Sequence, residues 1–247
     1  MPRMTRVTRS RSPATRVFAR IFYAALIAGI VAGLLVTGIQ SLKAWPLILK
    51  AEVYEQKAEA TEEAKLGHAM HEGHEWAPAN GAQRMLFTAT ANVLAGIGFA
   101  LLLGAAFALR GGVDWRYGLV WGLAGYATFV LAPALGLPPE LPGSEAAPLA
   151  ARQTWWIGTA LATGGGLAVV AFVGEQLWKA AGLLLILLPH VIGAPQRIDS
   201  SAVVPPDLTV NFIAVSLIGN LLFWLALGGI TALAFSRLDR PARAAPA

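Results

Sequence analysis

The chain contains six long apolar stretches, and their length constrains the fold more than any other feature. A hydrocarbon core of about 30 Å needs about 20 apolar residues in a helix, and every backbone polar group inside it must be hydrogen-bonded by the protein. Only 13% of the residues are charged, whereas about a quarter are charged in a soluble domain. The sequence predicts an all-α polytopic transmembrane helix bundle, with helices over residues 17–40, 86–109, 117–136, 154–173, 177–193 and 210–235.

Arginines at both ends of the chain predict its orientation. Six lie at or before the start of the first apolar stretch, and three follow the last one (Arg3, Arg6, Arg9, Arg11, Arg16, Arg20; Arg237, Arg240, Arg243). Because basic flanks stay in the cytoplasm, residues 1–16 and 237–247 are expected to be cytoplasmic segments. The stretch 17–40 exceeds the apolar region of a cleaved signal peptide, so we expect an uncleaved first transmembrane helix. Residues 41–85 then form an extracytoplasmic loop containing a helix, and residues 86–236 form the remaining bundle.

The number of crossings depends on the apolar region that ends at His190. A straight helix over its 36 residues would be about 54 Å long, so the chain must break, and Gly174–Lys179 offers a charged place to do so. Six crossings leave both basic ends inside, whereas five would put the second one outside. Six spans are therefore favoured and five remain the alternative, because the piece before His190 is either a tilted span or a re-entrant segment.

Small and polar residues inside the apolar stretches predict how the helices pack. Glycines recur at the spacing that lets membrane helices approach closely, in Gly29–Gly33, Gly118–Gly122 and the run 164–166. Several Asn and Thr side chains are expected to hydrogen-bond across the bundle, and a subset could line a pathway (Asn92, Thr128, Thr159, Thr163, Asn211, Asn220).

The loop over residues 41–85 concentrates acidic side chains and three of the four histidines. On a helix, its glutamates would form one acidic stripe, with the lysines opposite (Glu52, Glu55, Glu59, Glu62, Glu63; Lys50, Lys57, Lys65). A cation or a partner would stabilise that stripe, and a solvated, salt-screened helix is the alternative. The segment "HAMHEGHEW" follows, with His68, His71 and His74 interleaved with Glu72 and Glu75.

These side chains predict a metal site without thiolates, because the chain has no cysteine. Imidazole and carboxylate suit Co²⁺, Ni²⁺ or Zn²⁺. An ordinary surface loop is the alternative for the three histidines. Binding requires deprotonated imidazoles, so affinity should fall below about pH 6. "HEGH" is not the zincin HExxH signature, because its histidines are three residues apart, and no enzyme activity is expected.

Two further candidate ligands lie outside this loop. Glu140 occurs in the proline-rich "LGLPPELPG", with Arg152 as a candidate ion-pair partner, and a solvated loop acid is its alternative. His190 follows Pro189, and an interfacial histidine without a metal is its alternative. Under the six-span model, both would lie on the same outward side as the histidine-containing loop.

Taken together, these segments resemble the CbtA family, the predicted cobalt transporter subunit of bacteria. The resemblance rests on "PLILKAEVYE", "HAMHEGHEW", Gln83–Arg84 leading into "TANVLAGIGFALLL", "LGLPPELPG", "RQTWW" and "LLPHVIGAP". It implies a bacterial inner-membrane protein with five spans, cobalt uptake linked to cobalamin synthesis, and a small single-span histidine-bearing partner, CbtB. The matching candidate residues are Glu52, Glu55, His68, His71, His74, Glu140 and His190.

The function expected from the sequence is divalent metal uptake, with Co²⁺ or Ni²⁺ as the transported ion and no permanently bound cofactor. The chain has no Walker motif, so an ATP-driven step would need another subunit. No nucleic-acid partner is expected, because the basic residues flank membrane helices without interleaved aromatic residues. A non-transporting scaffold or metal-sensing accessory protein is the alternative.

Overall fold

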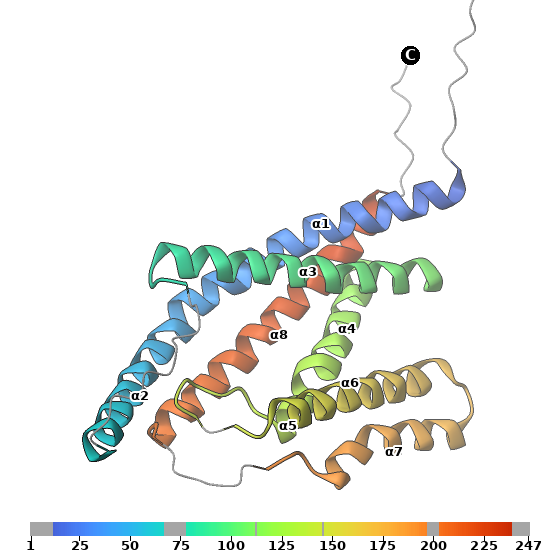
Figure 1. Cartoon of the computed structure of the whole chain (residues 1–247). Coiled ribbons are helices and arrows are strands. Elements are labelled where there is room, and N and C mark those ends of the chain that lie inside the picture. The colour runs from blue at the N-terminus through green and yellow to red at the C-terminus, as the bar shows by residue number, and fades with distance from the viewer. Residues whose placement is uncertain (1–11, 67–77, 112, 145, 197–202, 239–247) are drawn as a thin grey trace, which may run out of the picture.

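The computed structural model describes residues 12–66, 78–111, 113–144, 146–196 and 203–238. Every regular element in these ranges is a helix, which confirms the all-α bundle (Figure 1). In chain order the helices are α1 (Pro13–Ile39), the π-helix η1 (Gln40–Ala44), α2 (Trp45–Leu66), α3 (Ala82–Arg110), α4 (Trp115–Tyr126), the π-helix η2 (Ala127–Leu131), α5 (Ala132–Gly136), α6 (Leu149–Phe172), α7 (Gln176–Ile192) and α8 (Pro206–Arg237).

Local sequence signals set several helix boundaries. The Ser12 hydroxyl accepts a hydrogen bond from the Thr15 amide at 3.2 Å, and the Asp114 carboxylate accepts one from the Tyr117 amide at 2.9 Å. These contacts satisfy free amides at the first turns of α1 and α4. Gly111 and Gly193 follow the ends of α3 and α7 with φ of +71° and +90°, a conformation that favours glycine.

The chain does not leave the helix where its first apolar stretch ends. α1, η1 and α2 follow one another without a break, and Pro13–Thr61 forms one helical unit of 49 residues that contains an apolar, membrane-spanning length. A π-helical turn lies just before Pro46, which cannot donate to the Leu42 carbonyl as an α-helix requires. η2 is placed in the same way before Pro133. Both π-helices therefore end two residues before a proline.

The helices alternate in direction between two ends of the bundle. The start of α1 meets the end of α8, because an Arg20 Nη2 atom donates to the Phe235 carbonyl at 3.2 Å. α6 and α7 form a hairpin in which Trp155, early in α6, contacts His190, late in α7. Figure 1 shows α2 extending away from the end where α1 starts and α8 finishes.

Among the described residues, five helical units are long and apolar enough to cross a membrane, and α7 is a sixth apolar helix of 17 residues. Seventeen residues rise about 25 Å, slightly less than a hydrocarbon core of about 30 Å. The five long units agree with the span number implied by the family resemblance. α7 runs in the direction opposite to α6, so it returns the chain to the end of the bundle where α8 begins. The six-span prediction requires such a reversal.

Glycine seams hold three pairs of helices together, as the sequence predicted. A Cβ added at Gly33 of α1 would lie 2.6 Å from the Val93 Cα of α3. Gly118 and Gly122 of α4 contact the backbone of α8 at Gly228, and Gly166 of α6 contacts Gly182 of α7. Because these neighbours are backbone atoms, only residues without a side chain permit such close approach.

Candidate functional site

At the end of the bundle from which α2 extends, three chain segments pack together. Ala51 of α2, Leu141 between α5 and α6, and Val204 before α8 form a small buried apolar cluster. This cluster fixes α2 against the loops, so the two candidate glutamates Glu52 and Glu140 occur at the same end of the protein.

Glu52 is engaged in an ion pair that sequence reasoning did not predict. Its carboxylate accepts a hydrogen bond from Arg84 Nη2 at 2.6 Å, and Arg84 Nη1 donates to Asn80 Oδ1 at 2.7 Å. Both charged side chains are about one quarter exposed, 24% for Glu52 and 26% for Arg84. The pair links α2 to the start of α3, on either side of the segment that contains the clustered histidines.

Glu140 forms the ion pair with Arg152 that the sequence predicted. The Glu140 carboxylate lies 2.9 Å from Arg152 Nη2, and its side chain is only 16% exposed. The pair ties the proline-rich loop to the first turn of α6. The alternative of a freely solvated loop acid is therefore wrong for this conformation.

His190 and Glu55 have structural neighbours of other kinds. The half-buried His190 ring is T-shaped against Trp155, with ring centroids 6.0 Å apart. Glu55 packs beside the loop at Gly143, where an added Cβ would lie 3.1 Å from the Glu55 Cβ. Among the described residues, no three His, Asp or Glu side chains gather closely enough to hold a metal ion. His68, His71, Glu72, His74 and Glu75 lie outside the described residues.

Amide side chains meet inside the bundle at the junction of α1 and η1. Asn92 Nδ2 of α3 donates to Gln40 Oε1 at 2.7 Å and to Thr37 Oγ1 at 3.0 Å. Asn220 Nδ2 of α8 donates to the Ser216 carbonyl at 2.9 Å. The sequence predicted cross-bundle hydrogen bonds for Asn92 and Asn220. Asn92 makes them, whereas the bond of Asn220 to Ser216 stays within α8, and Gln40, which follows the end of the apolar stretch, was not predicted.

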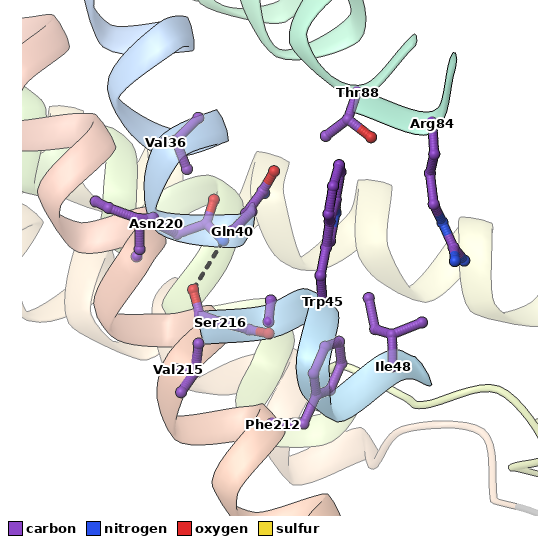
Figure 2. A pocket seen from close by; sticks show the side chains of 13 residues that line it. Val36, Gln40, Trp45, Ile48, Arg84, Thr88, Phe212, Val215, Ser216 and Asn220 are labelled. Atoms are coloured by element: carbon purple, nitrogen blue, oxygen red, sulfur yellow. Dashed lines mark hydrogen bonds between the residues drawn. The ribbon is translucent and has the colours of Figure 1, made fainter. Parts of the chain in front are cut away.

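Two cavities adjoin these amides. The first, of about 230 Å³, lies between the α1–α2 junction, the start of α3 and α8, and Figure 2 shows it with Ser216 and Asn220 on α8 and Arg84 and Thr88 on α3. The second, also about 230 Å³, is lined by aromatic side chains of α3, η2, α6 and α8 together with Asn92. Gln40, Asn220 and Val36 line both cavities.

Aromatic rings form the wall of the second cavity. Phe99, Phe129 and Trp224 contact one another, with centroid separations of 4.8 Å for Phe99–Trp224, 5.0 Å for Phe99–Phe129 and 5.6 Å for Phe129–Trp224. Such ring contacts are favourable beyond the area they bury.

Comparison with known proteins identifies one family. The model of the family described as "Probable cobalt transporter subunit (CbtA)" matches residues 18–236, which include all the described membrane helices except the first residues of α1 and the last residue of α8. No curated protein and no solved structure matches the chain. The matched range covers most of the chain and agrees with the polytopic all-α bundle, and the chain belongs to the CbtA family of probable cobalt transporter subunits.

Proposed function

We propose that this membrane cobalt transport subunit gathers a divalent ion at its outward face, with the His/Glu loop as the capture element. The observation that carries the proposal is the place of residues 67–77 in the chain, between α2 and α3. This histidine-containing segment joins α2 to α3, and the Glu52–Arg84 ion pair links the first half of α2 to the first turn of α3. The first half of α2 and the start of α3 thereby lie at the end of the bundle that also contains Glu140 and His190.

The orientation follows from the charge of the chain. Arg16 and Arg20 start α1 and Arg237 ends α8, so the positive-inside tendency favours a cytoplasmic location for that end. The opposite end, with α2 and the histidine-containing segment, would then face outward across the bacterial inner membrane. In this proposal, a metal arriving from outside would reach His68, His71 and His74 before it reaches the bundle.

The proposed ligands suit the proposed cargo. Imidazole nitrogens and carboxylate oxygens bind Co²⁺ and Ni²⁺, and the interleaved Glu72 and Glu75 add oxygen ligands. Glu52, Glu55, Glu140 and His190 would extend this cation-attracting surface. Because Glu52 and Glu140 already have arginine partners, a metal ion would have to compete with Arg84 and Arg152 for them.

Transport requires components that this chain does not supply. The chain has no Walker motif, so energy for uptake would come from an ion gradient or another subunit. The family resemblance supports a small single-span histidine-bearing CbtB-type subunit as the partner. The alternative function is a scaffold or metal-sensing accessory protein, which would bind metal without moving it.

Uptake of radiolabelled cobalt tests the proposal in cells expressing the chain with and without the small partner. We expect uptake with the partner present, and a sharp loss at limiting metal after His68, His71 and His74 are all replaced by alanine. A matched control replaces the exposed Lys57, Thr61 and Gln56 by alanine on α2. Absence of uptake in both settings, with normal membrane insertion, would favour the scaffold. Unchanged uptake in the triple histidine variant would remove the capture role.

A further inference from the structure

We propose that the amides of Gln40, Asn92 and Asn220 form an intramembrane binding station for a hydrated divalent cation, at the partition between the two cavities. The inference rests on the proposed transport function and names the next site on the path of the ion. These three residues belong neither to the histidine-containing loop nor to the acidic candidate ligands, and the proposal gives them a divalent cation as their ligand.

The first supporting observation is the shared lining of the cavities. Gln40 and Asn220 line both cavities, and Asn92 lines the second one while bonding to Gln40. Gln40 and Asn220 therefore lie between the two cavities, where an ion passing from one to the other would meet them. Polar side chains are costly inside a bilayer, and the subset that faces a cavity can line the path of an ion.

The second observation is independent of the side chains. Gln40 is the first residue of η1, and Phe129 and Val130 of η2 line the second cavity. The two described π-helices, each ending two residues before a proline, thus meet at one cavity. π-Helical turns are rare, they occur frequently at functional sites, and they are tolerated at membrane depth where protein surrounds them.

The three amides lie at one level of the bundle. Gln40 is 20 residues from Arg20, Asn92 is 18 residues from Arg110, and Asn220 is 17 residues from Arg237. At 1.5 Å per residue these separations correspond to about 26–30 Å from the basic end of each helix. The station would therefore lie in the outer part of a core about 30 Å thick, next to the cavity that Arg84 and Thr88 line.

The hydrogen bonds leave oxygen atoms available. Both amide hydrogens of Asn92 are used in bonds to Gln40 and Thr37, so its carbonyl oxygen is the atom that can accept a further contact. Carbonyl and amide oxygens with retained water suit a divalent cation, and neutral ligands bind it weakly enough for release. A full set of carboxylates at this level would instead trap the ion.

The absence of native cysteine gives a direct test. Ser216→Cys, which lines the first cavity, should react in intact cells with a membrane-impermeant cationic thiosulfonate. Ile218→Cys, two residues along α8 and 59% exposed on the outer surface of the bundle, should stay unlabelled in the bilayer. Millimolar CoCl₂ should slow the labelling of Ser216→Cys. Equal labelling of the two variants, or no protection by cobalt, would overturn the station.

A second measurement tests the amides themselves. Asn92→Leu and Asn220→Leu should each lower kcat/KM for cobalt uptake by about tenfold or more, the effect of losing one hydrogen bond to a charged group. Thr90→Leu, two residues before Asn92 on the exposed face of α3 and outside both cavities, is the matched control. Equal uptake by all three variants would contradict the proposal.

The two proposals fail in distinguishable ways. A wild-type chain without cobalt uptake refutes transport, yet the labelling and protection of Ser216→Cys still report whether the station binds the ion. Normal wild-type uptake together with an unprotected Ser216→Cys refutes the station and leaves transport intact. The labelling experiment uses Ser216→Cys and does not depend on an uptake defect. It therefore still tests the station if a leucine variant fails to insert into the membrane.

Discussion

Gly228 on α8 provides the strictest test of the packing described above. An alanine Cβ at this position would lie 2.8 Å from both the Cα and the amide nitrogen of Gly122, and closer still to the Gly118 carbonyl. Ordinary contact begins near 3.4 Å, so α4 and α8 would have to separate by more than half an ångström. The obstacle is backbone on all sides, and no side-chain rotation can relieve it.

The magnitude of the effect follows from two opposing contributions. Overpacking of a tight site costs about 1–3 kcal/mol, and an all-backbone seam belongs at the upper end of that range. Replacing glycine by alanine inside a helix gains about 1 kcal/mol from helix propensity. We therefore expect Gly228→Ala to lower the free energy of unfolding by about 2 kcal/mol.

The matched control is Gly158→Ala on α6, where an added Cβ has no atom within 4 Å. Only the propensity contribution remains there, so this variant should be more stable than the wild type by about 0.5–1 kcal/mol. Both variants can be unfolded by SDS titration from mixed micelles, with tryptophan fluorescence as the signal. A Gly228→Ala protein as stable as Gly158→Ala would refute the glycine seam between α4 and α8.

Three further predictions concern the candidate ligands. Glu52→Gln should lower the free energy of unfolding by about 1 kcal/mol, because its partner Arg84 is only partly exposed, and a double-mutant cycle with Arg84→Gln that shows no coupling would contradict this pair. His190→Phe keeps a ring against Trp155, so stability should be unchanged while cobalt affinity falls; unchanged affinity by titration calorimetry would remove His190 from the ligands. Cobalt affinity of the purified chain should decrease as pH falls below about 6, because protons and metal compete for imidazole nitrogens, and a flat profile from pH 8 to pH 5 would argue against histidine capture.

Hydrophobic length and glycine spacing were enough to predict the membrane helices and their seams. Both patterns can be recognised within a single helix, without knowing which helices pack against it, as for Gly118–Gly122 of α4. The Glu140–Arg152 pair was also predictable, because a short loop separates the two residues. The Glu52–Arg84 pair was not, since its partners are 32 residues apart in the chain and the whole histidine-containing segment lies between them.

The amides were harder to predict because the apolar pattern stops at Ile39. Gln40 and Ser41 resemble the start of a loop, yet the helix continues through η1 into α2. A sequence signal was present in Pro46 and again in Pro133, each of which disturbs the helical hydrogen bonds of the preceding turn. That signal gives the place of a break in each helix, but only the packed bundle shows that both breaks adjoin one cavity.

The positions of the seams and of the cavities together limit how the bundle can change shape. Backbone contacts between glycines hold α1 to α3, α4 to α8, and α6 to α7 as three pairs. The second cavity is lined by residues from all three pairs, including Asn92, Trp156 and Trp224. Because a close-packed seam resists gradual deformation, opening this cavity requires movement of one pair against another. The π-helices η1 and η2 lie in the elements that would have to bend, since each belongs to a helix that borders this cavity.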